Sequence, residues 1–478
     1  MTPPSHPLSP SDLPLLDAYD FSAVPEDIEA MWMPFTPQRA YRKSPLMLTR
    51  ADGMYVYGPD GRAALDASAG LYCVNAGHNP PRIGAAITAQ MQQMQYVPTF
   101  NLGHPVGFMA ARRLLDALPD HFSHVLFTNS GSEAVDTALK VARAYFKAIG
   151  QPSRKILIGR ERSYHGVGFG GLSVSGTYYN RAQFGPYLAD VDYLPHTHSL
   201  EHNRFVKGQP EWGAHLADNL ERLVYIHGAE NIAGVIVEPV TGSTGILPPP
   251  KGYLERLRAL CDKHGILLIF DEVVTGFGRM GTLTASEHFG VMPDMMTMAK
   301  GLTNAAVPMG ATLVSQKIHD AFMKGPEQFV ELMHGYTYSG HPLACAALIG
   351  TLDTFIEEDI LAHTKRMIPV FETAVHSMKD LPLVVDIRNC GMMAAVQLEE
   401  YSTEDPYFYQ RTMYREGLDI GLYCRFTAYN MIITPPLVIS EAQIGEVVDK
   451  LSQMIRRLAA SHPPKPRTHS RAIGEGGA

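Results

Sequence analysis

The chain has 478 residues, more than one hydrophobic core usually supports, so we expect two structural lobes. Hydrophobic residues make up 45% of the sequence and charged residues 18%, which is typical of a folded globular protein and excludes a disordered one. The formal net charge of −8 offers no electrostatic footprint for nucleic acid or an anionic membrane, so we expect small-molecule partners.

Five cysteines are scattered along the chain, without a CxxC motif or a Cys/His cluster. This distribution argues against a disulfide framework and a zinc site, and it fits a reducing compartment. No stretch reaches the ~18 apolar residues of a membrane span, and the N-terminus lacks the pattern of a signal peptide. We therefore expect a cytoplasmic protein without a bound metal, neither secreted nor anchored in a membrane.

Strand-like and helix-like segments alternate through the middle of the chain. Residues 1 to about 25 and the tail from 463 to 478 lack periodicity, and we expect both to fray or to drape over a partner. Between them, this order is typical of an α/β fold with a predominantly parallel sheet and helices on its faces. The strand-like segments are ILIG near 156, VDYLP near 192, GVIVEPV near 234, ILLIFDEV near 266, DMMTMAK near 294 and ATLVS near 311.

Two segments between these strands have the period of an amphipathic helix. KGYLERLRALCDKHG is one, and it ends at Gly265. The other opens at Ser132 and closes at Gly150, with one apolar stripe formed by Ala134, Leu139, Val141, Ala142 and Tyr145. After HPLACAALIGTLDTFIEE the pattern becomes a mixture of helices and short strands at LVVDIR, MAAVQLE and MIITPP, which predicts a smaller C-terminal domain.

The segment TNSGSEAVDTALK indicates a phosphate site. A strand ends in Asn-Ser-Gly-Ser at residues 129–132 and leads directly into a helix. Backbone N–H groups and hydroxyls then point at one spot, near the positive end of the helix dipole, which suits a phosphate. The alternative is an ordinary helix start, with Ser132 capping its own helix.

The segment ILLIFDEVVTGFGRMG places Asp271 and Glu272 at the C-terminal end of a hydrophobic strand, where open α/β sheets bind ligands. A carboxylate there can keep a pyridine nitrogen protonated, because the ion pair favours the charged ring, and a protonated ring is the better electron sink. The alternative, an acid that caps the next turn, suits Glu272 better than Asp271.

Lys300 follows the apolar strand in DMMTMAKGLTNAAVPMGA. A lysine beside a buried strand end is costly unless its amine is neutral or hydrogen-bonded. Burial and a neighbouring cation lower the pKa of a lysine, which provides the free amine that attacks an aldehyde in Schiff-base chemistry. The alternative is a lysine whose amine extends to solvent.

Taken in order, these segments resemble the class III aminotransferases, and most closely the branch that transfers amino groups from ω-amino acids such as β-alanine to pyruvate. The resemblance runs from MWMPFTPQRAY near 31 to ITPPLVIS near 433 and includes LDASAGLYCVNAGH, SYHG, GVIVEPVTGSTG and HGYTYSGHPLA. It implies pyridoxal 5'-phosphate (PLP) as coenzyme and the fold type I of aspartate aminotransferase, with a mainly parallel seven-stranded sheet. The implied parts are an N-terminal segment, 1–75, that contributes to the small domain and the substrate pocket, a large PLP-binding domain, 76–336, and a small α+β domain, 337–478.

The resemblance also implies roles around the coenzyme. Lys300 would form the Schiff base with PLP and move the proton. Asp271 would pair with the pyridine nitrogen. Val273 and Tyr164 would pack on opposite faces of the ring, and His165 would stand at the edge of the pocket unless it only packs.

Further residues would hold the phosphate and organise the site. Gly131 and Ser132 would bind the phosphate, and Glu238, in GVIVEPV, would organise the Asp271 side of the pocket. Thr337, in HGYTYSGHP, would reach the phosphate of the neighbouring subunit. The resemblance therefore implies a homodimer with shared active sites, and a tetramer built from such dimers stays open.

On the substrate side, Arg425 stands where this branch keeps a mobile arginine for the substrate carboxylate. Such a group is needed because pyruvate and an amino acid carry a carboxylate, whereas an amine donor does not. The alternative is a surface arginine beside a strand. Phe35 and Tyr72 would line the substrate pocket. Tyr72 stands where this branch usually has Trp, so the pocket gains a hydroxyl and some volume there. Tyr178 and Tyr179 are further candidates at the pocket edge, with packing as the alternative.

The predicted reaction is transfer of an amino group from an ω-amino acid or a primary amine, β-alanine-like or chiral, to pyruvate, giving alanine. Within PLP enzymes the rivals are a 2-oxoglutarate-dependent transaminase of ornithine or γ-aminobutyrate type and an aminomutase. From other classes, the rivals are a non-catalytic dimeric scaffold of the same fold and an NAD-binding enzyme. The NAD-binding enzyme lacks support because no GxGxxG motif follows a first strand.

Overall fold

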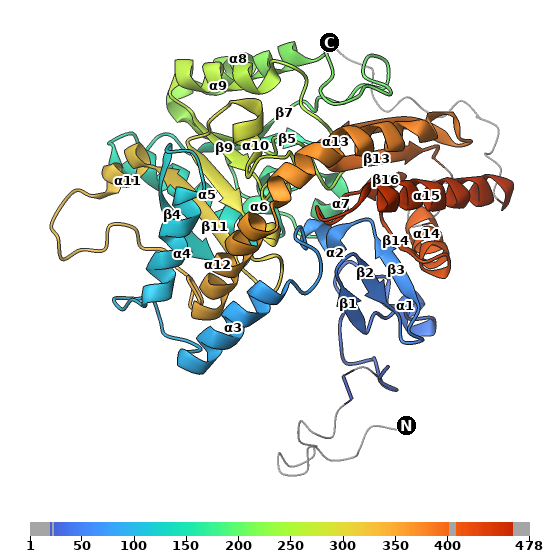
Figure 1. Cartoon of the computed structure of the whole chain (residues 1–478). Coiled ribbons are helices and arrows are strands. Elements are labelled where there is room, and N and C mark those ends of the chain that lie inside the picture. The colour runs from blue at the N-terminus through green and yellow to red at the C-terminus, as the bar shows by residue number, and fades with distance from the viewer. Residues whose placement is uncertain (1–19, 22, 401–407, 462–478) are drawn as a thin grey trace, which may run out of the picture.

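The computed structural model describes residues 20–21, 23–400 and 408–461. They form a large sheet with helices on both faces and two smaller four-stranded sheets on one side of it (Figure 1). Nearly all of residues 1–25 and the whole tail from 463 to 478, for which we expected frayed or draped conformations, lie outside the described residues.

The large sheet has eight strands in the described residues, one more than predicted, because the two-residue strand β6 and strand β7 both pair with β5. It is mainly parallel, as predicted, and β11 runs antiparallel to both of its neighbours. The order is β4-β11-β10-β9-β8-β5-β6. The strands are β4 (Phe122–Thr128), β5 (Ile156–Glu161), β6 (Ser175–Gly176), β7 (Val191–Leu194), β8 (Ile232–Val237), β9 (Leu267–Asp271), β10 (Met295–Met298) and β11 (Gly310–Ser315).

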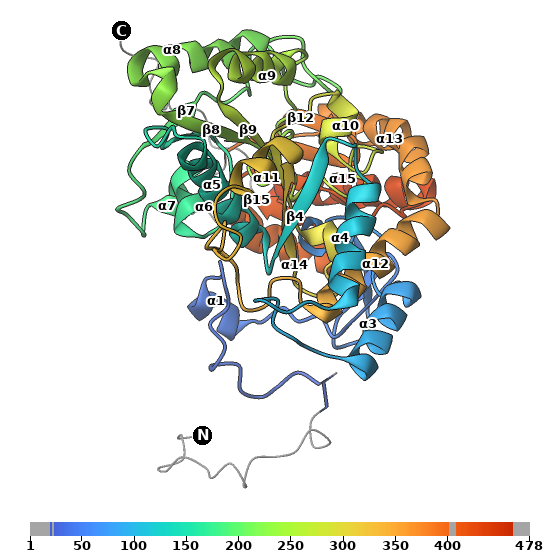
Figure 2. The same ribbon diagram turned by 90° about the vertical axis from the view of Figure 1, so that its left-hand side faces the viewer.

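Helices cover both faces of this sheet, which explains why its central strands are continuous apolar runs. Alternate side chains of β8 and β9 enter two different cores. One core includes helix α5 (Gly131–Ala148), and the other includes α8 (Asn219–His227) and α9 (Tyr253–His264). The turned view places α8 and α9 together and α5 nearer the middle of the molecule (Figure 2).

The two helices predicted from periodicity are both present. Helix α9 stops before Gly265, which adopts the left-handed conformation expected of a terminating glycine. Helix α5 begins one residue earlier than predicted, and the cap is Ser130 rather than Ser132, because the Ser130 hydroxyl accepts the backbone N–H of Glu133. Ser132 lies in the first turn instead, so its side chain is free of the capping role.

The two smaller sheets join distant parts of the chain. The first has the order β1-β2-β3-β14, so C-terminal residues complete a sheet built from N-terminal ones. The second has the order β12-β13-β16-β15, and its β12, β13 and β16 are the three C-terminal strands predicted from sequence. The bounds are β1 (Arg50–Asp52), β2 (Tyr55–Tyr57), β3 (Ala63–Asp66), β12 (Val384–Cys390), β13 (Met393–Leu398), β14 (Leu422–Tyr423), β15 (Arg425–Thr427) and β16 (Asn430–Ile433).

The remaining helices surround these sheets. They are α1 (Gln38–Lys43), α2 (Ala69–Tyr72), α3 (Pro81–Gln93), α4 (Pro105–Asp116), α6 (Phe169–Val174), α7 (Tyr178–Arg181), α10 (Ala285–Phe289), α11 (Gln316–Phe322), α12 (Pro342–Glu357), α13 (Ile360–His376), α14 (Phe408–Asp419) and α15 (Glu441–Ser461). Short 3₁₀ helices are η3 (Ala214–Asp218), η4 (Ala229–Asn231), η5 (Lys300–Thr303) and η6 (Ser377–Asp380).

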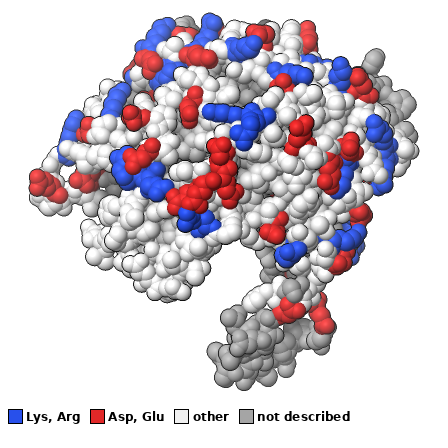
Figure 3. Space-filling model, in the orientation of Figure 1, with Lys and Arg blue, Asp and Glu red and all other residues white. Residues whose placement is uncertain are grey.

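Acidic and basic side chains are interspersed over the face shown in Figure 3. No helix within the described ranges is both long enough and apolar enough to cross a membrane. In the same part of the chain, no group of three or more His, Cys, Asp or Glu side chains is arranged to hold a metal ion.

Candidate active site

The C-terminal ends of three neighbouring parallel strands bring together the acids and the lysine singled out in the sequence. Glu238 directly follows β8, Asp271 is the last residue of β9, and Lys300 lies two residues beyond β10. Because β8, β9 and β10 are adjacent and parallel, their ends meet at one edge of the sheet. This is the edge at which open α/β sheets bind ligands.

Three hydrogen bonds fix the carboxylate of Asp271, which is 5% exposed. One oxygen lies 2.7 Å from Nδ1 of His165. The other accepts the backbone N–H of Val273 at 3.1 Å and the hydroxyl of Thr297 at 3.2 Å. Thr297 stands directly opposite Asp271 in the pairing of β9 with β10. A carboxylate held in this way keeps one orientation.

His165 is buried and turns its Nδ1 toward Asp271. Because a carboxylate only accepts, Nδ1 is the donor of this bond. Its other ring nitrogen, Nε2, is buried without a hydrogen-bond partner among the described residues. His165 therefore orients Asp271, a contact that goes beyond simple packing.

Glu238 connects the end of β8 to the Tyr164 segment. Its carboxylate accepts the backbone N–H of Tyr164 at 3.0 Å and that of Gly242 at 2.8 Å. Burial raises the pKa of Glu238, and burial likewise raises the pKa of the Tyr164 hydroxyl. The acid thus positions the backbone beside Tyr164.

Lys300 opens the 3₁₀ helix η5 with a left-handed backbone, φ +51°. Its Nζ lies 4.8 Å from the centroid of the Tyr72 ring. Burial lowers the pKa of the Lys300 amine, and the charge of Arg425 lowers that pKa further. This is the direction that a nucleophilic amine requires.

The N-terminus of α5 packs closely against the residues that follow β9. A Cβ added to Gly131 would lie 3.0 Å from Cγ1 of Val273 and 3.4 Å from Cβ of Ala299. A larger residue at 131 would therefore push α5 away from Val273. The hydroxyl of Ser132 accepts the backbone N–H of Val167 at 3.1 Å, which ties this helix start to the loop after His165.

Arg425, the first residue of β15, is a cation among aromatic rings. Its guanidinium carbon lies 5.6 Å from the centroid of the Tyr72 ring. Burial acts to lower the pKa of Arg425, but Tyr72, Tyr414 and Tyr423 together raise it. Its Nε is buried without a hydrogen-bond partner, and no ion pair joins it to an acid in the part of the chain that the structure describes. Such a guanidinium has donors available for a ligand carboxylate.

The remaining predicted residues, on the substrate side and at the phosphate of the neighbouring subunit, differ in their placement. Tyr72 is 2% exposed, and its ring lies near both Lys300 and Arg425. Phe35 is 75% exposed, and Thr337 is exposed as well. Tyr178 and Tyr179 on α7 are each 74% exposed. The single chain therefore gathers Tyr72 into the site and leaves the other four at its surface.

Glu272 has the structural role that the sequence left open for it. Its carboxylate accepts the backbone N–H groups of Ala285 at 2.6 Å and Ser286 at 2.8 Å, and the hydroxyl of Thr275 at 3.1 Å. It thereby holds the first residues of α10. Burial raises the pKa of Glu272 to about 7, although its three donors favour the charged form.

This pKa gives a testable dependence of stability on pH. Between the ordinary value of 4.5 and about 7, the folded chain keeps a proton that the unfolded chain has released. The free energy of unfolding should therefore fall as the pH rises through this window, by up to about 1.4 kcal/mol for each pH unit. Glu272→Gln, which mimics the protonated acid, should show a smaller fall in unfolding temperature between pH ~5 and ~7.5.

Glu287→Gln is the matched control, because Glu287 is exposed on the same helix. Its unfolding temperature should follow the wild-type pH curve. Parallel curves for Glu272→Gln and the wild type would contradict the raised pKa.

Sequence reasoning missed Thr297. Its hydroxyl is the only polar side-chain group in the strand Met-Met-Thr-Met, and its register opposite Asp271 is the signal that could have revealed it. His165 was a candidate, but its bond to Asp271 spans 106 residues and carries no local pattern.

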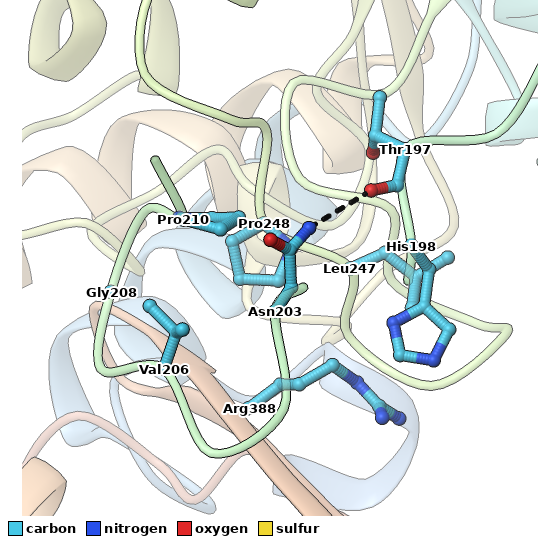
Figure 4. Close-up of a pocket in the computed structure, with 9 residues that line it drawn as sticks. All are labelled: Thr197, His198, Asn203, Val206, Gly208, Pro210, Leu247, Pro248 and Arg388. Atoms are coloured by element: carbon cyan, nitrogen blue, oxygen red, sulfur yellow. Dashed lines mark hydrogen bonds between the residues drawn. The ribbon is translucent and has the colours of Figure 1, made fainter. Parts of the chain in front are cut away.

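A separate hollow lies between the loop of residues 197–210 and the second small sheet (Figure 4). All three nitrogens of Arg388, which borders it, already donate within the chain, to Asp386, Gln397, Asn430 and the backbone oxygens of Gly245 and Ile246. The hollow therefore has no free guanidinium donor. None of the predicted site residues is among those that line it, which are Thr197, His198, Asn203, Val206, Gly208, Pro210, Leu247, Pro248 and Arg388.

Comparison with known proteins identifies the family. Residues 36–455 match the family described as aminotransferase class-III. An omega-aminotransferase of Caulobacter vibrioides is 53% identical over 91% of this chain and 99% of its own length. A beta-alanine–pyruvate aminotransferase of Pseudomonas aeruginosa is 41% identical over 91% of this chain and 97% of its own length. An amine transaminase from an uncultivated Pseudomonas species, solved in its PLP-bound form, is 36% identical with a TM-score of 0.82, over 91% of this chain and 99% of that one.

The chain belongs to the class III aminotransferases. This membership confirms the predictions of an aminotransferase, of fold type I and of PLP as coenzyme. The geometry described above also fits PLP. Asp271 offers a fixed carboxylate for a pyridine nitrogen, Lys300 an amine with a lowered pKa for an aldehyde, and the N-terminus of the 18-residue helix α5 a site for a phosphate.

Proposed function

We propose that this aminotransferase moves the amino group of an ω-amino acid or a primary amine to pyruvate, giving alanine. The observation that carries the proposal is Arg425, a cation without an acidic partner in the described ranges. Its guanidinium lies near the same Tyr72 ring as the amine of Lys300. Pyruvate is a small keto acid whose carboxylate suits a guanidinium. The name of the Caulobacter relative supports an ω-amino donor, and the name of the Pseudomonas aeruginosa relative supports β-alanine as donor and pyruvate as acceptor.

The chain's own residues supply binding, orientation and proton transfer. When bound, PLP supplies an electron sink that stabilises negative charge on the carbon bearing the amino group. Lys300 would hold its aldehyde, Asp271 its pyridine nitrogen, and the start of α5, with Gly131 and Ser132, its phosphate. Val273 and Tyr164 would enclose its ring.

Lys300 acts as the proton carrier, because an amine with a lowered pKa is more readily available in its neutral form to accept a proton from the donor carbon and return it. His165 and Thr297 hold Asp271 in one orientation throughout. Glu238 keeps the Tyr164 backbone in place. The donor and the keto acid use the same site in turn, so a ping-pong rate law follows.

Removing the amine at position 300 tests the catalytic role. Lys300→Ala should lower kcat by about 10⁴-fold or more, because both covalent attachment and proton transfer are lost. The variant should still take up PLP without a covalent bond, measured as coenzyme content after gel filtration. Lys263→Ala, at an exposed lysine on α9, should behave as the wild type. Near-normal transamination by Lys300→Ala would contradict the proposal.

Removing the guanidinium at position 425 tests the acceptor. Arg425→Ala should raise the KM for pyruvate at least tenfold, since a charge-assisted pair contributes about 1.5–3 kcal/mol. The half-reaction with an amine that lacks a carboxylate should change by less than about threefold. Arg256→Ala, an exposed arginine paired with Asp218, is the control. Equal losses for both substrates would reject the carboxylate role, and a panel of keto acids would reveal a preference for 2-oxoglutarate.

We further propose the division into an N-terminal segment, 1–75, a large domain, 76–336, and a small domain, 337–478. The pairing of β14 with β3 supports it, because it joins the first part to the third. We also propose a cytoplasmic location, which five free cysteines, four of them buried, support.

Finally, we propose that two chains form a homodimer with shared sites and that Thr337 reaches the coenzyme phosphate of the other chain. Apolar side chains gathered just before it support this surface as an interface. They are Phe329, Val330 and Met333, which are 66%, 59% and 84% exposed.

Sedimentation equilibrium tests this assembly. The mass should be at least twice the 52.6 kDa of one chain. Met333→Asp, which places a charge in the apolar surface, should shift the protein toward the monomer, whereas Lys263→Ala should not. A single-chain mass for the active wild-type enzyme would contradict shared sites.

A further inference from the structure

The backbone around Lys300 needs support from its surroundings. Lys300 and Asn304, at the two ends of the η5 turn, have φ values of +51° and +50°. This left-handed region is unfavourable for residues with a side chain, least so for Asn. Within the turn, the Lys300 carbonyl accepts the N–H of Ala305 at 3.1 Å. The Gly301 carbonyl likewise accepts the N–H of Asn304 at 3.1 Å. Two left-handed residues in one short turn persist only where neighbours support them.

The side chain of Asn304 provides one such contact. It is 4% exposed, and its Oδ1 accepts the backbone N–H of Ala76 at 2.8 Å. Its Nδ2 donates to the backbone oxygen of Gly77, also at 2.8 Å. Both ends of the amide are thus used on one short backbone segment, 228 residues away in sequence from Asn304.

That segment is itself rigidly held, mainly through Asn75, which is 1% exposed. The Asn75 side chain donates to the Phe277 oxygen at 2.7 Å and accepts from Arg279 Nη2 at 2.6 Å. The Asn75 backbone oxygen accepts the N–H of Leu437 at 2.7 Å. Residues 75–77 therefore form a fixed support against which the Lys300 turn rests.

Gly301 allows the turn to come this close. A Cβ at position 301 would lie 2.7 Å from Nδ2 of Asn75 and 2.7 Å from Cβ of Phe277. Both distances are far inside van der Waals contact, so any side chain at 301 would push the turn off its support.

The same N-terminal stretch also touches the amine. The Tyr72 ring, three residues before Asn75, lies 4.8 Å from Lys300 Nζ. We infer that Asn304 and Gly301 are positioning residues for Lys300: they seat its turn on residues 75–77, so that the amine stands at a fixed place over Tyr72. This inference rests on the proposed role of Lys300. A displacement of about 1 Å at a reacting group costs up to about 10²-fold in rate.

Two variants test the inference by different routes in the holoenzyme. Asn304→Gly keeps the left-handed backbone and removes both amide hydrogen bonds. Gly301→Ala keeps those bonds and inserts a methyl group. Asn79→Gly is the control for the first, because Asn79 is an exposed left-handed asparagine with a side-chain bond to Ala51. Gly445→Ala is the control for the second, because its added Cβ meets nothing within 4 Å.

Each variant is measured in three ways: kcat and KM for both substrates, unfolding temperature, and the pH midpoint at which the visible absorption of the bound coenzyme changes. We expect both variants to lose about tenfold to 10²-fold in kcat, with KM changed by less than about threefold. The absorption midpoint should move by at least about half a pH unit, because it reports the surroundings of the lysine nitrogen. Both controls should match the wild type.

An unchanged absorption midpoint in both variants overturns the inference, whatever happens to kcat and unfolding temperature, because a purely structural loss would leave that midpoint in place. If Asn304→Gly does not fold, Gly301→Ala decides alone. Failure of the proposed function is separate. An active Lys300→Ala enzyme would reject the catalytic role of the lysine itself. If Lys300→Ala is inactive while Asn304→Gly and Gly301→Ala behave as the wild type, only the positioning role is rejected.

Discussion

The buried hydrogen bond between Asp271 and His165 is the constraint on which the site depends. A carboxylate that is 5% exposed is costly to bury unless its oxygens are paired. His165, Thr297 and the Val273 N–H pair them here, and each comes from a different direction: the loop after β5, the neighbouring strand and the following turn. The requirement to satisfy one charge therefore fixes the relative position of three strand ends, and the remaining groups of the site are arranged around that fixed point.

The N-terminal part of the chain is the second requirement of the site. Residues 63–66 enter a sheet with the C-terminal strand β14, and residues 72–77 then cross to the lysine turn. Arg279, fully buried, ties Asn75 to the backbone of Pro435. Hydrogen bonds between groups far apart in sequence thus add to the local bonds of the short η5 turn. Lys300 thus belongs to the segment after β10, but residues 75–77 near the N-terminus hold its turn in place.

Much of this could be read from the sequence, because apolar strands that end in a charged residue are visible locally. Asp271 and Lys300 each follow such a run, and the resemblance to a family supplied Tyr164, Glu238 and Arg425. Contacts that depend on the folded chain were not accessible. The Asn304 amide finds its partners 228 and 227 residues away, and nothing in LTNAAV indicates them. The helix cap fell on Ser130 instead of Ser132 because two serines flank one glycine, and only the backbone decides which hydroxyl reaches Glu133.

Arg425 is an example of a binding residue that lowers the stability of the fold. A guanidinium packed among tyrosine rings, with a buried nitrogen unbonded and no acid beside it in the described part of the chain, has its charge compensated by those rings and by no carboxylate. A neutral residue there would make a more robust fold and a poorer receptor for an anion. Any small carboxylic acid that binds there supplies the missing acidic partner, so it protects the native chain against heat with the logarithm of its concentration once the site is mostly filled, whether or not it can react.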